Sequence, residues 1–322
     1  MTHTKILGTG SYMPNHIITN QDLEKIVDTS DAWITSRTGI KNRPMTIDEN
    51  TSDLAYQAAL KALESTDISA EDLDLIIVAT ITGDYVLPGV AQLLQRKLGA
   101  RMIPAFDINA ACSGFIYALD IADKMIQSEA YRHILIVGAD ILSKITDFSD
   151  RNTCVLFADG AGAMVLGPSK EKHIKAIQTF SKGDQELLLY MDSYPLKKNF
   201  ETPPQARPFV KMQGSDVFKF AVWAMPYTLN KLSETSQIAL DDLELIVAHQ
   251  ANERIIRYAA KSLKIPMDKM FMNIGKTGNT SAASVPIAID EAVQSNRLRR
   301  NQVFGTVAFG GGLTWGGAII KY

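Results

Sequence analysis

The fold of this chain is decided by one segment, Asp107-Ile108-Asn109-Ala110-Ala111-Cys112-Ser113-Gly114-Phe115. An apolar run precedes the segment, and apolar residues recur at helical spacing after it, so we predict that it joins a buried strand to a helix. Backbone N–H groups at a helix start are unpaired and carry partial positive charge, so we expect the Cys112 thiol to ionise easily. Cys112 is therefore a candidate nucleophile, and the alternative is a cysteine that only packs in the core.

On both sides of this segment, apolar strands alternate with helical patterns. We predict helices over Thr51–Glu64 and Pro88–Leu98, and buried strands over Leu73–Thr80 and Leu243–Val247. Thr153–Phe157 also has the pattern of a strand, with Cys154 in the core. Such alternation is typical of α/β proteins with mostly parallel sheets covered by helices.

The second half of the chain repeats the first at an offset of 170 residues. Residues 71–79 resemble residues 241–249, and the predicted strand Ile134–Ala139 corresponds to Phe304–Phe309. We therefore predict two copies of one α/β unit, with the active site where the copies meet. The two units are residues 1–170 and 171–322.

The offset places Cys112 opposite Ala282. The fold is therefore predicted to be duplicated while the nucleophile occurs in the first copy alone.

Composition excludes several classes of function. The 322 residues are 46% hydrophobic and 21% charged, with a formal net charge of -2, so nucleic-acid binding by bulk charge is not indicated. Two cysteines are too few for a disulfide framework or a zinc site, and we expect no metal and a reducing cytoplasm. We also expect no signal peptide and no transmembrane segment.

Three further motifs lie at predicted strand or helix ends. His249 follows a buried strand, where open α/β sheets place ligands, although it could be purely structural. Asn279 follows Gly278 in a loop where it could merely cap the next helix. The run Gly310-Gly311-Gly312 follows another buried strand, and is either a plain turn or a source of backbone N–H groups for an oxyanion.

Taken together, these motifs resemble those of the β-ketoacyl-[acyl-carrier-protein] synthase III family, within the thiolase superfamily. The resemblance runs from end to end and implies a thiolase-like duplicated α/β fold, with two mixed, mostly parallel five-stranded sheets layered with helices as αβαβα. It implies the initiating condensation of type II fatty acid biosynthesis, in which a short acyl-CoA and malonyl-acyl carrier protein give 3-oxoacyl-carrier protein, CoA and CO₂. No cofactor is implied beyond the CoA thioester.

The resemblance also implies roles for individual residues. Cys112 would form an acyl-enzyme, with the N–H groups of Cys112 and Gly312 as the oxyanion hole. His249 and Asn279 would donate hydrogen bonds to the malonyl thioester oxygen during decarboxylation. The CoA-binding residues implied are Thr29, Trp33, Arg37, Arg151 and Gly214, with the adenine between Trp33 and Arg151.

A homodimer is expected from the same family. Leu87 stands where many members carry Phe, and in the family this residue reaches the acyl pocket of the partner. A smaller side chain there predicts tolerance of longer or branched primers.

One surface can be predicted from helical spacing alone. Four cations follow Asn252 at intervals of three, four and three residues, on one helical face: Arg254, Arg257, Lys261 and Lys264. Such a face is often just solvated, but acyl carrier proteins are strongly acidic, so we interpret it as the docking face. The resemblance adds Lys219.

Individual residues argue against two rival interpretations and leave two others open. A degradative thiolase would need a second catalytic cysteine after Cys154, and elongating synthases use a second His where this chain has Asn279. An acyltransferase of secondary metabolism with the same Cys, His and Asn stays open, as does a scaffold that has kept the fold without catalysis.

Overall fold

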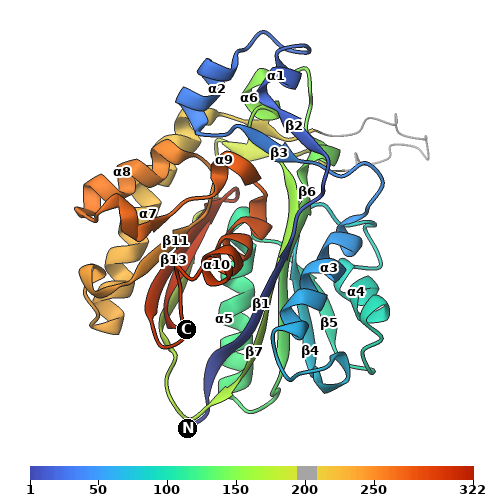
Figure 1. Cartoon of the computed structure of the whole chain (residues 1–322), viewed down its shortest axis with the longest axis vertical. Helices are drawn as coiled ribbons and strands as arrows, with labels where there is room; N and C mark the ends of the chain where they lie inside the picture. The colour runs from blue at the N-terminus through green and yellow to red at the C-terminus, as the bar shows by residue number, and fades with distance from the viewer. Residues whose placement is uncertain (194–208) are drawn as a thin grey trace.

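The computed structural model describes residues 1–193 and 209–322. Its helices and two five-stranded sheets stack in the order helix, sheet, helix, sheet, helix, and a smaller cap lies above one end of the stack (Figure 1). This is the layered α/β architecture that the sequence predicts.

The first sheet has the strand order β1-β7-β6-β4-β5, in which only β7 runs antiparallel to its neighbours. All residues of β4 and β6 are buried, as expected for sequences that are apolar except for Asp140 in β6. Its strands are β1 (His3–Tyr12), β4 (Leu75–Ala79), β5 (Ala105–Ile108), β6 (Ile134–Ile141) and β7 (Asp159–Ser169).

The second sheet has the order β12-β11-β13-β14-β8, with β14 as its strand antiparallel to both neighbours. Its strands are β8 (Ile174–Ser181), β11 (Leu245–Ala248), β12 (Met270–Phe271), β13 (Val303–Gly310) and β14 (Thr314–Lys321). Strand order and direction therefore repeat between the sheets, which agrees with the predicted duplication.

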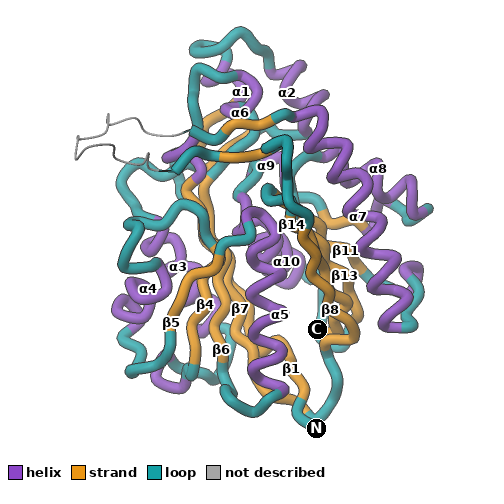
Figure 2. The backbone as a smooth tube through the Cα atoms, turned by 180° about the vertical axis from the view of Figure 1, so that it is seen from behind, coloured by secondary structure: helices purple, strands orange, loops and turns teal. Residues whose placement is uncertain are grey.

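Two helices fill the space between the sheets, α5 (Gly114–Gln127) and α10 (Ser284–Gln294) (Figure 2). Each begins with a 3-10 turn, η2 (Ala111–Ser113) before α5 and η6 (Ser281–Ala283) before α10. Apolar side chains of both helices pack with those of both sheets into one core. The segment that carries Cys112 is thus held between the two copies.

The outer faces of the sheets are also covered. The helices α3 (Thr51–Glu64) and α4 (Val90–Leu98) pack on the first sheet, and α7 (Gly214–Ser236) packs on the second with α8 (Glu253–Leu263) beside it. The helix predicted over Pro88–Leu98 begins two residues later than expected. The Asp107 carboxylate explains this start, because it accepts the N–H groups of Val90 and Ala91, each at 2.7 Å.

The cap carries the short elements β2 (Ile17–Thr19), α1 (Asn20–Leu23), α2 (Asp31–Thr38), β3 (Asn42–Pro44) and α6 (Arg151–Cys154). Arg43 ties the segments of the cap together: its buried guanidinium donates to the Val155 carbonyl, just after α6, at 2.9 Å and to the Ile18 carbonyl of β2 at 3.2 Å. The strand predicted over Thr153–Phe157 is wrong, because Cys154 ends helix α6, although Cys154 is buried as expected.

The remaining short elements are η1 (Ala70–Asp72), η3 (Leu142–Ile145), β9 (Leu189–Tyr190), β10 (Lys211–Met212), η4 (Leu240–Asp242), η5 (Met267–Lys269) and α9 (Ile274–Thr277). None of the helices in residues 1–193 and 209–322 combines the length and apolar character needed to span a membrane.

Candidate active site

Cys112 lies in the turn η2, between the end of β5 and the start of α5. Ala111 has a φ of 46°, so the backbone reverses sharply just before the thiol. The Thr314 hydroxyl donates to the Ala110 carbonyl at 2.9 Å and accepts from Ser113 Oγ at 2.7 Å. A residue of the second sheet therefore holds the nucleophile's turn in place.

The expected easy ionisation of Cys112 is wrong for this structure. The side chain is 8% exposed, and burial raises the pKa of the Cys112 thiol to about 11. Desolvation of the thiolate outweighs the favourable helix start, because the turn lies under the second copy of the fold. At neutral pH the group is a thiol, and its proton must leave as it attacks.

His249 follows β11 and is 1% exposed. Its ring lies edge-on to Phe309, with 5.2 Å between ring centres. Burial lowers the pKa of His249 to about 3, so the imidazole is neutral at physiological pH. Among the described residues, its buried Nδ1 has no hydrogen-bond partner.

Asn279 is held by both its backbone and its side chain. Its N–H donates to the Leu156 carbonyl, and its carbonyl accepts from the Ala158 N–H, each at 2.9 Å. The side-chain Oδ1 accepts from the Ser281 N–H at 3.0 Å. Only the amide oxygen can accept from an N–H, so the NH₂ group is left as the donating end of the side chain.

These three residues line one cavity of about 90 Å³. Gly214, Phe218, Asn252, Gly310 and Gly311 are also on its wall. The structure therefore brings Cys112 from the first copy together with His249 and Asn279 from the second. A neutral imidazole and a carboxamide beside a thiol can supply hydrogen bonds to a thioester oxygen while the sulfur attacks.

A second cavity of about 300 Å³ shares Cys112 with the first. Its apolar wall includes Ile81, Leu142, Ile145, Phe157 and Val210. The sequence motifs did not indicate this cavity, because its lining comes from loops that are distant in the chain.

The glycine loop lies between the two cavities. Gly311 lines both of them, whereas Gly312 lines only the larger. The N–H of Gly311 is thus a candidate oxyanion donor alongside that of Gly312, within the glycine run that the sequence indicated.

Comparison with known proteins identifies the family. The model for 3-oxoacyl-[acyl-carrier-protein (ACP)] synthase III matches residues 106–184, and the model for its C-terminal part matches residues 233–322. A β-ketoacyl-[acyl-carrier-protein] synthase III of Clostridium acetobutylicum is 47% identical and covers 100% of this chain, which covers 99% of that protein. The chain belongs to the 3-oxoacyl-[acyl-carrier-protein] synthase III family. It is therefore a condensing acyltransferase.

Solved structures agree with this assignment to the synthase III family. The 3-oxoacyl-[acyl-carrier-protein] synthase III of Aquifex aeolicus has a TM-score of 0.93 at 46% identity, with 99% of this chain and 100% of that chain covered. The priming β-ketosynthase of the R1128 polyketide pathway has a TM-score of 0.92 at 32% identity, with 99% and 96% covered. The fold predicted from the sequence is confirmed.

Within this synthase III chain, the residues expected to bind CoA lie in the cap and at the cavity mouth. Arg151 covers the Trp33 ring, with its guanidinium carbon 5.1 Å from the ring centre, and its Nη1 donates to the Asp28 carbonyl at 2.7 Å. A base between two planar groups needs about 7 Å, twice the optimal separation of stacked carbon atoms. Adenine can enter the expected position only after Trp33 and Arg151 separate.

The other three residues expected to bind CoA lie at different places. Gly214 lies on the cavity wall, and the Arg37 carbonyl accepts from Asn252 Nδ2 at 3.0 Å, which places α2 beside that wall. The Thr29 hydroxyl is buried without a hydrogen-bond partner in the described part of the chain.

The cationic face of α8 begins at the cavity mouth. Arg254, Arg257 and Lys261 of α8 are exposed, while Ile255, Ile256, Ala259 and Ala260 are buried. Lys264 is also exposed, but it lies just past the end of α8 with a φ of 56°, so the predicted helical face carries three of the four cations. Arg254 stacks on Phe218 of the cavity wall, at 5.3 Å from the ring centre.

Two of the expected docking cations are paired with neighbours on their own helices. Glu253 lies 2.6 Å from Arg257, and Asp216 lies 2.8 Å from Lys219. Within the described residues, Arg254, Lys261 and Lys264 have no such ion pair.

Leu87 does not line either cavity of its own chain. It is 81% exposed, and Tyr85 and Val86 beside it are also exposed apolar side chains. Leu87 can therefore contact an acyl group only in the cavity of a second copy of the chain.

Gln250 is a residue whose role sequence reasoning missed. Its Oε1 accepts from the Asn273 N–H at 3.1 Å, and its Nε2 donates to the Phe271 carbonyl at 3.1 Å. Its own N–H donates to Ser284 Oγ at 2.8 Å. The buried amide thus ties the His249 loop to the segment that leads to Asn279. Its position directly after His249 was the available signal.

Proposed function

We propose that this chain condenses a short-chain acyl-CoA primer with malonyl-[acyl-carrier protein], giving 3-oxoacyl-[acyl-carrier protein], CoA and CO₂. One observation carries the proposal: Cys112, His249 and Asn279 line one cavity, with Cys112 also on the wall of a larger apolar one. Family membership supplies the class of reaction. Beyond the CoA thioester, the proposed reaction uses no cofactor.

In the first step, Cys112 Sγ attacks the thioester carbonyl carbon of the acyl-CoA. The new bond between sulfur and acyl carbon replaces the bond to the CoA sulfur, and the thiol proton leaves with CoA. The negative oxygen of the intermediate is stabilised by the N–H groups of Cys112 and of the glycine loop, at Gly311 or Gly312. The acyl chain then lies in the larger cavity.

In the second step, malonyl-carrier protein places its thioester oxygen against His249 and Asn279. Loss of CO₂ leaves an enolate whose charge is on that oxygen, and two neutral donors stabilise it without becoming charged themselves. The enolate carbon attacks the acyl carbon on Cys112. The thiolate leaves and is protonated again.

The test of this function also tests primer size. With malonyl-carrier protein as the second substrate, we expect product from both acetyl-CoA and isobutyryl-CoA, because a cavity of about 300 Å³ exceeds what an acetyl group fills. We propose that Leu87 of a homodimer partner closes this cavity. Leu87→Phe should then shift the ratio of kcat/KM toward acetyl-CoA by roughly tenfold, as expected for added bulk in an apolar pocket.

Val86→Phe is the matched control, since it adds the same ring to the neighbouring exposed position and should leave the ratio unchanged. A strong acetyl preference of the wild type would contradict the assignment of primer size. Absence of product with every acyl-CoA would overturn the function itself.

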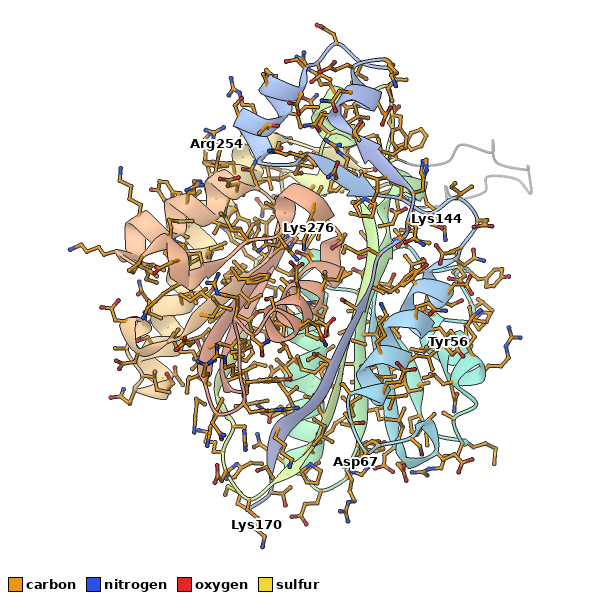
Figure 3. All side chains as sticks on the ribbon, viewed as in Figure 1. Tyr56, Asp67, Lys144, Lys170, Arg254 and Lys276 are labelled. Atoms are coloured by element: carbon orange, nitrogen blue, oxygen red, sulfur yellow. The ribbon has the colours of Figure 1, made fainter. Side chains whose placement is uncertain are left out.

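The cationic face of α8 is proposed to dock the acidic carrier protein. Lys261→Glu should raise KM for malonyl-carrier protein about threefold to tenfold at low ionic strength, and less in high salt, because rim charges act mainly by steering. Lys170→Glu makes the same change of charge at the opposite end of the molecule, far from Arg254 (Figure 3). An equal effect of both changes would contradict docking on α8.

A second candidate function is the priming of a secondary-metabolic pathway. The likeness to the priming β-ketosynthase of the R1128 polyketide pathway favours it. Comparing malonyl groups carried on a fatty-acid carrier protein and on a polyketide carrier protein would decide between the two functions.

A further inference from the structure

The two copies of the fold make the same sharp turn before their central helices. At the offset of 170 residues, Ala111 has a φ of 46° and Ser281 a φ of 51°. Asn109 Oδ1 accepts from the Ala111 N–H at 3.2 Å, as Asn279 Oδ1 accepts from the Ser281 N–H at 3.0 Å. The N–H of Ala282 is therefore the counterpart of the N–H of Cys112.

The two counterpart N–H groups face different partners. The Ala282 N–H donates to Asp140 Oδ2 at 3.2 Å. The counterpart of Asp140 in β13 is Gly310, where an added Cβ would lie 2.7 Å from the Cys112 nitrogen. One copy thus holds a carboxylate oxygen against this N–H, while the other keeps the approach to Cys112 clear.

Asp140 joins the two copies because one of its oxygens bonds to the first copy and the other bonds to the second. It is 0% exposed, and its Oδ1 accepts from the Ile81 N–H at 2.9 Å and from the hydroxyls of Thr80 and Thr82 at 3.0 and 2.8 Å. Its Oδ2 faces the turn that carries Asn279. A carboxylate at the end of β6 therefore fixes that turn relative to the first copy.

We propose that Asp140 is a positioning residue for Asn279, and that its carboxylate occupies in the second copy the place that the thioester oxyanion takes in the first. This inference rests on the proposed function, because it assigns Asn279 to the decarboxylation step. Asp140 lines neither of the two cavities. It acts by holding the turn Asn279–Ala282, through the Ala282 N–H.

Asn is the informative substitution because it keeps the size of the side chain. In the wild type, both oxygens of Asp140 accept from backbone N–H groups, those of Ile81 and Ala282. An amide has one accepting oxygen, so its NH₂ must face one of these N–H groups. The three donors around the Oδ1 position favour the amide oxygen of the new Asn side chain there. Its NH₂ group then faces the Ala282 N–H, and this repulsion pushes the turn Asn279–Ala282 away.

The experiment measures the two partial reactions of Asp140→Asn separately. We expect CO₂ release from malonyl-carrier protein to fall roughly tenfold, the effect of one lost buried hydrogen bond, while acylation of Cys112 by acetyl-CoA stays within about twofold. Asp159→Asn is the matched control. Asp159 is equally buried and accepts from Ser143 and Thr46, but among the described residues its side chain has no hydrogen bond to residues 279–282.

If Asp140 acts through Asn279, its substitution should have no effect on decarboxylation once the Asn279 side chain is gone. Asp140→Asn should cause no additional loss of decarboxylation in an Asn279→Ala background. An equal fall of both partial reactions, or an additive loss in that background, would show a merely structural role and overturn the inference.

Crystal structures of the wild type and of Asp140→Asn test the inference apart from the reaction. We expect the turn at residues 279–282 to move relative to Cys112. An unmoved turn would overturn the inference even if the wild type condenses its substrates, whereas an inactive wild type with a moved turn would overturn only the proposed function.

Discussion

Alanine in place of Cys112 is expected to abolish formation of 3-oxoacyl product, by a factor on the order of 10⁴ or more, because no acyl-enzyme can form. Decarboxylation of malonyl-carrier protein should persist, since His249 and Asn279 line the cavity independently of the sulfur. The measurement pairs the yield of condensed product with the release of CO₂. Intact-mass analysis after incubation with acetyl-CoA should show an acyl adduct on the wild type and none on Cys112→Ala.

Cys154→Ala is the control for this result. Cys154 is the second cysteine of the chain and is fully buried in a separate apolar cluster with Leu23 and Ile34. Its loss should leave the acyl adduct intact. If the Cys112→Ala variant carried an acyl adduct and the Cys154→Ala variant carried none, the assignment of Cys112 as the nucleophile would be refuted.

Substitution of Asn279 is expected to have the second largest effect. Asn279→Ala removes a donor to the enolate oxygen and should lower the rate of decarboxylation by about 10² to 10³. His249→Ala should cause a similar loss. Acylation of Cys112 should change much less, because these donors serve the second step.

Asn279→Asp separates hydrogen-bond donation from positioning. The carboxylate can still accept the Ser281 N–H and so preserve the turn, but it presents a negative oxygen where the NH₂ group was. The loss should therefore equal or exceed that of Asn279→Ala. Decarboxylation close to the wild-type rate in Asn279→Asp would contradict donation by this side chain.

The pH dependence of the second step follows from the state of His249. Burial lowers the pKa of His249 to about 3. An imidazole carries its positive charge only below its pKa, so His249 is charged only in strong acid. The imidazole therefore stays neutral from pH 5 to pH 8. In the same assays, the decarboxylation rate should show no inflection near 6.5, the ordinary pKa of His.

The sequence predicted the architecture well because its signals are local and repeated. The offset of 170 residues placed Cys112 opposite Ala282, and both residues lie in matching turns before α5 and α10. The convergence of His249 and Asn279 was predictable because both follow strand or loop ends at one edge of the sheets.

What the sequence could not show depends on contacts between the copies. The raised pKa of Cys112 comes from burial by the second copy, which no local motif encodes. The Arg43 contact with the Val155 carbonyl belongs to a helix end and not to the strand predicted there. Asp140 was missed because it is a single polar residue at the end of an apolar strand, and its partners lie 58 to 142 positions away.

The placement of Cys112 between a narrow cavity and a larger one has a kinetic consequence. In the proposed reaction, both thioester arms reach the sulfur through the cavity that His249 and Asn279 line. CoA must therefore depart before the carrier arm enters, while the acyl group waits on the other side of the sulfur. The two substrates take turns, as in a ping-pong scheme, and the shape of the site sets their order.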